Sequence, residues 1–211
     1  MDSKAAESAK PTKCMHCSKP MSTPLLCDYC ETLNPLPNMT DHFQLLGLSR
    51  RFDLDDKALH DSYLALSRHT HPDYHAGQSA EVQALAQTVS AAVNEAYRTL
   101  FAPVRRASYL LELVGGASSA QEKGVPDGFL SQMMMLQEEV EDAKLAHDQA
   151  ALARLGQVLH TQQDGLMRRV AALFGELEAA SACEATRQAM LAEIRQQLNA
   201  VSYVRKLLSQ T

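Results

Sequence analysis

Four cysteines near the amino terminus have the spacing of a metal site. Cys14 and Cys17 form one Cys-x-x-Cys pair, "CMHC", and Cys27 and Cys30 form a second, "CDYC". Each pair turns two thiolates toward one centre, and four thiolates make a closed tetrahedral site for Zn²⁺. Iron in a rubredoxin-like site is the rival, because the same ligands suit it, and disulfides or free thiols are the alternative without a metal. We predict structural zinc on these four ligands.

The stretch "RHTHPDYH", residues 68–75, gathers three histidines around a proline. Their i, i+2, i+6 spacing does not stack on one helix face, and no HExxH motif accompanies it, which disfavours a metal site. The chain also has no Gly-rich phosphate loop, GxSxG or Walker motif, so catalysis by this chain is not expected. Taken alone, the stretch is most simply a turn in which Pro72 stops one helix and Asp73 caps the next.

Composition and charge exclude several classes of protein. The chain has 211 residues and a net charge of −5, which argues against a broad nucleic-acid-binding surface. No apolar run approaches the roughly 20 residues that a membrane span needs. The first residues, "MDSKAAESAKPTK", have neither the apolar core of a secretory signal nor the arginines of a presequence. The expected compartment is the cytoplasm, or the mitochondrial matrix if a presequence has been removed.

Apolar residues with helical spacing predict a hairpin around the histidines. Leu59, Tyr63 and Leu66 mark one face of a helix over about residues 55–69, which Pro72 must end. A second, longer helix follows, and a shorter one spans residues 103–114. The two long helices should pair antiparallel, with "RHTHPDYH" at their tip. The stripe of the longer helix comprises Val82, Leu85, Val89, Val93, Ala96 and Leu100.

Three further helices are expected after a loop at residues 117–126. The first spans about residues 127–146, and none of the three can bury its apolar stripe alone, so a small bundle is predicted. Cys183, in the last part of the chain, is expected to be a small buried residue. We therefore divide the chain into a four-cysteine module with a Pro-rich linker, "NPLPN" (residues 1–38), a hairpin domain (40–116) and a helical bundle (127–211).

Several of these segments together resemble a known family. The sequences "DHFQLLGL" (41–48), "FDLD" (52–55), "HPD" (71–73), "AAVNEAYRTL" (91–100) and "RRASYLLELVG" (105–115) are similar to a J-domain, and most of all to that of the HscB family of iron–sulfur co-chaperones. The segment "FLSQMMMLQEEVED" (129–142) looks like that family's "FLMEQxxLREEL". The expected fold class is all-α: a J-domain hairpin and a C-terminal three-helix bundle, preceded by the small four-cysteine module.

The resemblance implies a mechanism in which the chain is not itself an enzyme. J-domains dock on a DnaK-type ATPase chaperone, here of the HscA kind, and accelerate its ATP hydrolysis. His71, Pro72 and Asp73 would make the required contact, with Arg68 and Lys57 adding positive charge. The family usually has a lysine where this chain has Tyr74, so electrostatic steering toward an acidic chaperone surface should be weaker here.

The resemblance also implies a client, an IscU-like iron–sulfur cluster scaffold protein. Carried over by register, the scaffold-binding positions are Leu130, Met134, Met135 and Glu138; Ser131 stands where an apolar residue is usual. Independently, three consecutive helical residues span about 200°, so Met133–Met135 cannot all face one core and at least one is exposed. An exposed methionine suits an adaptable protein-binding face.

Other interpretations differ in what the chain would bind. A J-protein for another client differs only in what the bundle binds. A zinc-knuckle nucleic-acid-binding protein and a metalloenzyme are disfavoured by the acidic charge and by a closed site of four thiolates. Whether the chain forms a homodimer is left open. We expect no nucleic acid and no membrane among its partners.

Overall fold

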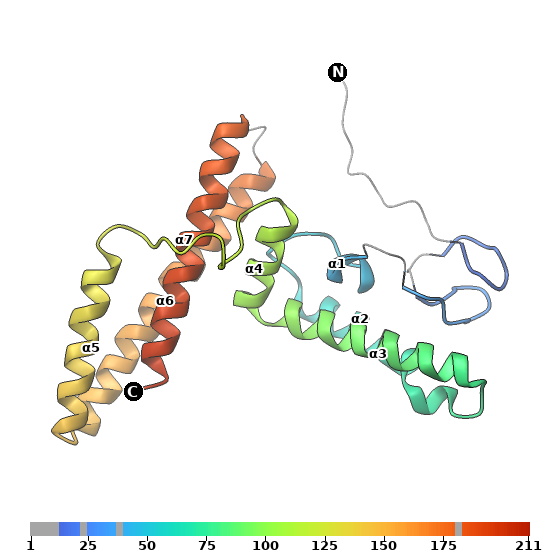
Figure 1. Cartoon of the computed structure of the whole chain (residues 1–211), viewed down its shortest axis with the longest axis horizontal. Coiled ribbons are helices and arrows are strands. Elements are labelled where there is room, and N and C mark those ends of the chain that lie inside the picture. Colours follow the sequence, from blue (N-terminus) through green and yellow to red (C-terminus); the bar gives the residue numbers. More distant parts are fainter. Residues whose placement is uncertain (1–12, 22–24, 37–39, 180–182) are drawn as a thin grey trace. The chain divides into compact units, whose positions relative to one another are not determined.

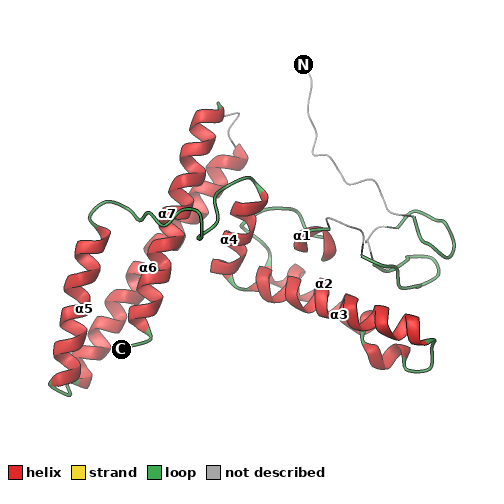
Figure 2. Ribbon diagram, in the orientation of Figure 1, coloured by secondary structure: helices red, strands yellow, loops and turns green. Residues whose placement is uncertain are grey.

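The regular secondary structure in the described part of the chain is helical, as predicted. The structure is a computed structural model that describes residues 13–21, 25–36, 40–179 and 183–211. Within these ranges the only β-type pairings are isolated bridges, Lys13 with Pro20 and Leu26 with Leu33 (Figure 2). The helices are α1 (His42–Leu45), α2 (Asp56–Thr70), the 3-10 turn η1 (Pro72–His75), α3 (Ala80–Phe101), α4 (Pro103–Leu113), α5 (Phe129–Leu145), α6 (Gln149–Ala179) and α7 (Glu184–Leu208) (Figure 1).

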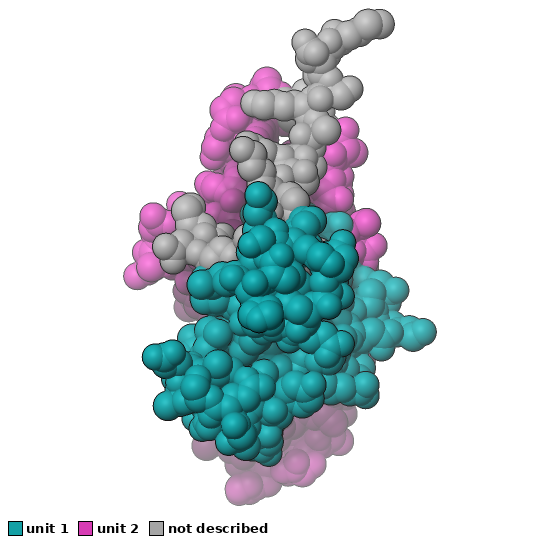
Figure 3. Space-filling view, turned by 90° about the vertical axis from the view of Figure 1, so that its right-hand side faces the viewer, with its two compact units in different colours: residues 1–50, 54–102 teal, residues 51–53, 103–211 magenta. Residues whose placement is uncertain are grey.

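The chain divides into two compact units (Figure 3). The first comprises residues 1–50 and 54–102, and so holds the cysteine pairs and helices α1–α3. The second comprises residues 51–53 and 103–211, and so holds helices α4–α7. The functional division at residues 38, 116 and 127 stays a prediction, and the last two residues of the predicted linker, 37 and 38, lie outside the described residues.

Helices α2 and α3 form the expected antiparallel hairpin. The Tyr63 hydroxyl donates a 2.9 Å hydrogen bond to Asn94 Oδ1, and the ring of Tyr63 stacks on that of Tyr97 with centroids 4.1 Å apart. Helix α2 ends at Thr70, one residue later than predicted, because the residue before Pro72 is pushed out of the helical region. The hydroxyl of Ser79 caps α3, so the expectation that Asp73 caps the next helix was wrong.

In the second unit, α5, α6 and α7 bury their stripes against one another. Their shared core is made of Phe129, Met133, Leu136, Val140, Ala143, Leu152, Leu155, Leu159, Ala200, Val204 and Leu207. Polar side chains of α7 also hold the loop that follows α4. Arg187 Nη2 donates to Val114 O (2.7 Å), Arg195 Nε to Ala117 O (3.0 Å), and Asn199 Nδ2 to the carbonyls of Glu122 and Gly124. Burial lowers the pKa of Arg195.

Two further expectations can be compared with the described residues. Cys183 is exposed at the N-cap of α7, so its expected burial was wrong. The helix pattern continues only from Glu184, and the cap position lies outside the apolar stripe. No helix in the described ranges has the length and apolar content needed to cross a membrane.

The bundle core yields a stability prediction. Leu159 of α6 is fully buried in the shared core, whereas its neighbour Val158 is half exposed. Leu159→Ala should lower the free energy of unfolding by about 2–5 kcal/mol, because it leaves a cavity that the bundle cannot fill. Val158→Ala is the matched control and should cost less than about 0.5 kcal/mol. Denaturant unfolding followed by circular dichroism measures both; equal losses would contradict this core.

Candidate metal centre and docking surfaces

The four predicted cysteine ligands come together at one point. The Sγ atoms of Cys14 and Cys30 are 3.6 Å apart, those of Cys17 and Cys27 are 3.5 Å apart, and all four lie within 4.8 Å of one another. A tetrahedral ion with Zn–S bonds of about 2.3 Å places its sulfurs about 3.8 Å apart. The donor set and its spacing therefore fit one tetrahedral metal ion, and the residues that would hold it are the four predicted ones.

The two cysteine pairs lie on two separate turns that have the same backbone hydrogen bonds. In residues 13–20, the first knuckle, Cys14 N–H donates to Lys19 O (2.9 Å) and Ser18 N–H to Cys14 O (2.9 Å). In residues 26–33, the second knuckle, Cys27 N–H donates to Thr32 O (3.2 Å) and Glu31 N–H to Cys27 O (3.0 Å). Each turn passes through a positive φ directly after its second cysteine, 59° at Ser18 and 54° at Glu31. The two knuckles are thus related by a 13-residue repeat (Cys14 to Cys27, Cys17 to Cys30).

The close approach of the sulfurs opposes full ionisation without a cation. Hydrogen bonds with the side chain and the backbone N–H of Thr32 lower the pKa of Cys30 to about 5. The backbone N–H of Lys19 also favours the Cys17 thiolate, but burial and the neighbouring sulfurs raise the pKa of Cys17 to about 12. A bound divalent cation supplies the charge that lets all four thiolates form. A closed set of four thiolates leaves no open position for substrate, so such an ion is structural.

The turn that carries His71, Pro72 and Asp73 is rigid and presents its side chains outward. Its backbone is tied by Tyr74 N–H to His71 O (3.0 Å) and by Ala76 N–H to Asp73 O (3.3 Å). The Asp73 side chain is 92% exposed. His71 Nδ1 accepts the Asp73 backbone N–H at 3.2 Å, and the Asp73 carboxylate lies 3.6 Å from the same nitrogen. That tautomer leaves Nε2–H as a donor for a partner.

The turn depends on a residue to which the sequence assigned no function. His75 is buried, and its Nε2 lies 2.8 Å from the carbonyl oxygen of His69 in the last turn of α2. This bond satisfies a carbonyl that the end of the helix would otherwise leave without a partner. Tyr74, at the position where the family has lysine, is exposed, and its ring meets those of His69 and His75 edge-on. In the sequence, the only signal for this role of His75 is its place three residues after Pro72, the proline that ends the helix.

The two predicted cations lie at opposite ends of α2. Lys57 and Arg68 are both exposed and are 11 residues apart, about three turns or roughly 16 Å along the helix axis. That spacing puts them on one side of α2, but only Arg68 is close in sequence to the turn at His71–Asp73. The predicted chaperone-binding set thus has one cation near the turn and one distant from it.

Helix α5 turns the predicted scaffold-binding residues to solvent. Met133 is in the core, whereas Met134 and Met135 are 65% and 64% exposed, which confirms the expectation from the three-residue run. Leu130 is half exposed and Glu138 is exposed. Tyr203 of α7, which the sequence did not single out, is also half exposed and packs edge-on against Phe129, with ring centroids 6.2 Å apart. Only packing between α5 and α7 brings this ring beside the α5 face.

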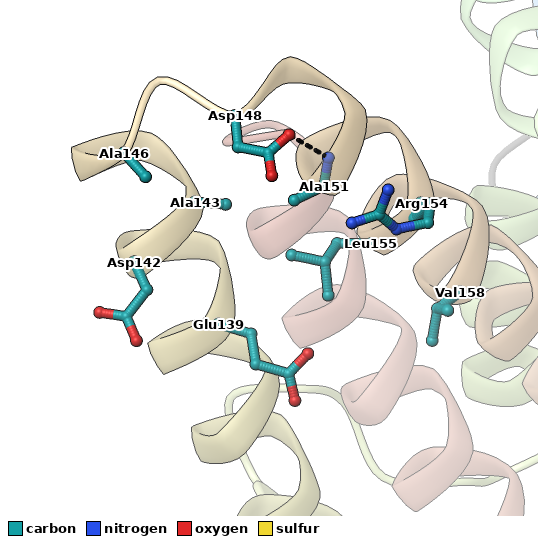
Figure 4. Close-up of a pocket in the computed structure, with 9 residues that line it drawn as sticks. All are labelled: Glu139, Asp142, Ala143, Ala146, Asp148, Ala151, Arg154, Leu155 and Val158. Carbon is teal, nitrogen blue, oxygen red and sulfur yellow. Dashed lines mark hydrogen bonds between the residues drawn. The ribbon is translucent and has the colours of Figure 1, made fainter.

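A hollow of about 530 Å³ lies between α5 and α6 near their connecting turn (Figure 4). Its floor is apolar, with Ala143, Leu155 and Val158, and Glu139 projects from α5 while Arg154 projects from α6 (Figure 4). Asp148 is occupied as the cap of α6, because its Oδ1 accepts Ala151 N–H at 2.9 Å. The hollow is shallow and open and has no catalytic arrangement of groups.

Comparison with known proteins identifies the family. The family described as "HSCB C-terminal oligomerisation domain" matches residues 125–210. The co-chaperone protein HscB homolog of Ralstonia nicotianae is 37% identical over 154 residues, which cover 72% of this chain and 88% of that protein. The chain belongs to the HscB family of co-chaperones. The co-chaperone protein HscB of Proteus mirabilis is 34% identical over 61% of this chain and 78% of its own length.

Solved HscB structures share this fold. The crystal structure of human co-chaperone protein HscB superposes with a TM-score of 0.74 at 25% identity and covers 93% of this chain and 94% of its own. Chaperone HscB from Vibrio cholerae gives a TM-score of 0.63 at 30% identity, covering 81% of this chain and 94% of its own. The resemblance drawn from the sequence is therefore correct, and the chain combines the HscB fold with a cysteine cluster suited to a metal.

The cysteine cluster predicts a local response to metal removal. The buried cluster around the sulfurs has Met21 as its one non-cysteine member among the described residues, so a metal that joins the four thiolates should supply much of the stability of the knuckles. A strong chelator should therefore unfold residues 13–34 and leave the helices intact. Hydrogen exchange resolved by peptide should rise in the knuckles, while circular dichroism at 222 nm changes little. Unchanged protection of the knuckles in metal-free protein would contradict a structural metal.

Proposed function

We propose that this HscB-family chain is a co-chaperone in iron–sulfur cluster assembly. It binds a cluster scaffold protein of the IscU kind through the exposed face of α5 and brings it to an ATPase chaperone of the DnaK/HscA type. It stimulates that chaperone's ATP hydrolysis through His71, Pro72 and Asp73. The observation that carries the proposal is the turn itself, which holds an almost fully exposed Asp73 carboxylate on a rigid backbone.

The proposed contact with the chaperone follows from the chemistry of the turn. Pro72 and the backbone hydrogen bonds leave little conformational freedom to lose on docking, which lowers the entropic cost of binding. The Asp73 carboxylate is free to form a charge-assisted pair with a guanidinium of the chaperone. His71 Nε2–H offers a second, neutral donor, and Arg68 and Lys57 complement an acidic surface. The hydrolytic chemistry takes place in the chaperone, and this chain supplies no catalytic group.

The proposed contact with the scaffold uses apolar surface rimmed by acid. Leu130, Met134 and Glu138 are at i, i+4 and i+8 and therefore share one side of α5, with Met135 beside them. Methionine adapts to irregular partner surfaces, and exposed apolar groups of this kind mark interaction sites. Zinc on the four cysteines is the metal we propose, with a structural role. A J-protein serving another client would share the turn but not this partner.

The turn yields the first functional prediction. Asp73→Asn removes the charge but keeps the size and the backbone, so stimulation of the chaperone's ATPase should be lost while the helical circular dichroism signal is retained. Single-turnover ATP hydrolysis by a DnaK/HscA-type chaperone measures the effect. Glu81→Gln, which removes an exposed acid from the first turn of α3, is the matched control and should stimulate normally. Full stimulation of the chaperone's ATPase by Asp73→Asn would contradict the proposed contact.

The exposed face of α5 yields the second functional prediction. Met134→Ala combined with Glu138→Ala should weaken binding of an IscU-like scaffold at least tenfold, because it removes an exposed apolar anchor and its neighbouring charge. Scaffold-independent stimulation of the chaperone should be unaffected. Calorimetric titration with the scaffold gives the affinity. The control is Val158→Ala with Glu178→Ala, which also shortens a half-exposed apolar side chain and removes an exposed acid, but on α6. A double variant with wild-type affinity would assign the scaffold, or another client, to a different surface.

A further inference from the structure

The 13-residue repeat of the two knuckles is broken at one buried position. The repeat aligns Met21, after the first knuckle, with Asn34, after the second. Both side chains are buried, with exposures of 4% and 3%, but only Asn34 is polar. The sequence suggested that Asn34 begins the linker "NPLPN"; the structure instead ties it to the second knuckle, because its backbone N–H donates to Leu25 O at 2.7 Å and the two residues flank that knuckle.

The Asn34 side chain spans from its own knuckle to the other one. Its Oδ1 accepts the backbone N–H of Met15, between the first pair of cysteines, at 2.8 Å. Its Nδ2 donates to the carbonyl of Thr32 at 2.8 Å and points a second hydrogen toward Cys14 Sγ at 3.8 Å. The amide orientation is determined by these neighbours, because the oxygen faces an N–H donor and the nitrogen faces a carbonyl acceptor. The Oδ1 bond to Met15 N–H and the Nδ2 contact with Cys14 Sγ therefore connect the two knuckles, while the bond to Thr32 O fixes the amide on its own side.

We propose that Asn34 is a positioning residue that holds the two cysteine pairs in register for metal binding. The buried cluster between the knuckles contains Cys14, Met21 and Cys27, with Cys17 and Cys30 at its edge. The buried Asn34 amide accepts Met15 N–H across the gap and faces Cys14 Sγ with one Nδ2 hydrogen. Parting the knuckles is costly, because it leaves Oδ1 and Met15 N–H without partners. The Asn34 side-chain N–H also stabilises negative charge on the Cys14 sulfur, as hydrogen bonds to metal ligands do.

Two substitutions separate the parts of this role. Asn34→Ala removes every side-chain bond, and Asn34→Asp keeps the size and the acceptor for Met15 N–H but loses the donor and adds charge beside the thiolates. We expect Asn34→Ala to bind Zn²⁺ about 10–100-fold more weakly than wild type. We expect Asn34→Asp to be weakened at least tenfold. Competition of the full-length chain with a chromophoric chelator measures Zn²⁺ affinity, and Co²⁺ absorption reports the geometry of the thiolate site.

Met21→Ala is the control, because it removes a larger buried side chain from the same cluster without touching these bonds. Its Zn²⁺ affinity should fall less than that of Asn34→Ala. The inference is overturned if Asn34→Asp binds like wild type, or if Met21→Ala loses as much affinity as Asn34→Ala, since packing would then decide. If the wild-type chain binds neither Zn²⁺ nor Co²⁺, metal binding itself is refuted. That outcome differs from one in which the wild type binds the metal and Asn34 proves to have no positioning role.

Discussion

Each long helix of this chain has a narrow apolar stripe that it cannot bury alone. The chain has no tryptophan and few other aromatic residues, so its cores are built mainly from Leu, Val and Ala, with a few buried phenylalanines, and these side chains fill space only when two helices lie side by side. Antiparallel pairing of α2 with α3, and of α6 with α7, is the economical way to hide these stripes. Most other features of the molecule follow from what these pairings leave outside.

The surfaces proposed for function are what the pairings cannot cover. A hairpin of two helices must have a connecting turn, and in this chain that turn carries His71–Asp73 and is stiffened by Pro72 and by the buried His75. A helix with one stripe must also have an outer side, and α5 places two of three consecutive methionines there. In both places the rigid part of the fold is apolar and buried, while the groups offered to a partner protrude from it.

The cysteine module obeys a different rule, because four sulfur atoms and not an apolar stripe lie at its centre. Two copies of one tight turn bring four sulfurs close together, which is unfavourable for thiolates unless a cation is present. The same constraint is the setting of the role proposed for Asn34, because its Oδ1 accepts Met15 N–H and its Nδ2 faces Cys14 Sγ across the gap between the two turns.

The sequence by itself determined the helices, the cysteine ligands and the exposed proline turn. These are local properties: apolar periodicity marks a helix face, Pro72 forbids helix at the residue before it, and Cys-x-x-Cys sets the direction of two sulfurs. The angular spread of three consecutive methionines was likewise enough to require exposure at Met134 or Met135. Only the tertiary structure decided the roles of Asn34, His75 and Tyr203, and the exposure of Cys183. Each of these depends on which atoms a fold brings from 6 to 74 residues away, or on where a helix begins, and no local pattern encodes that.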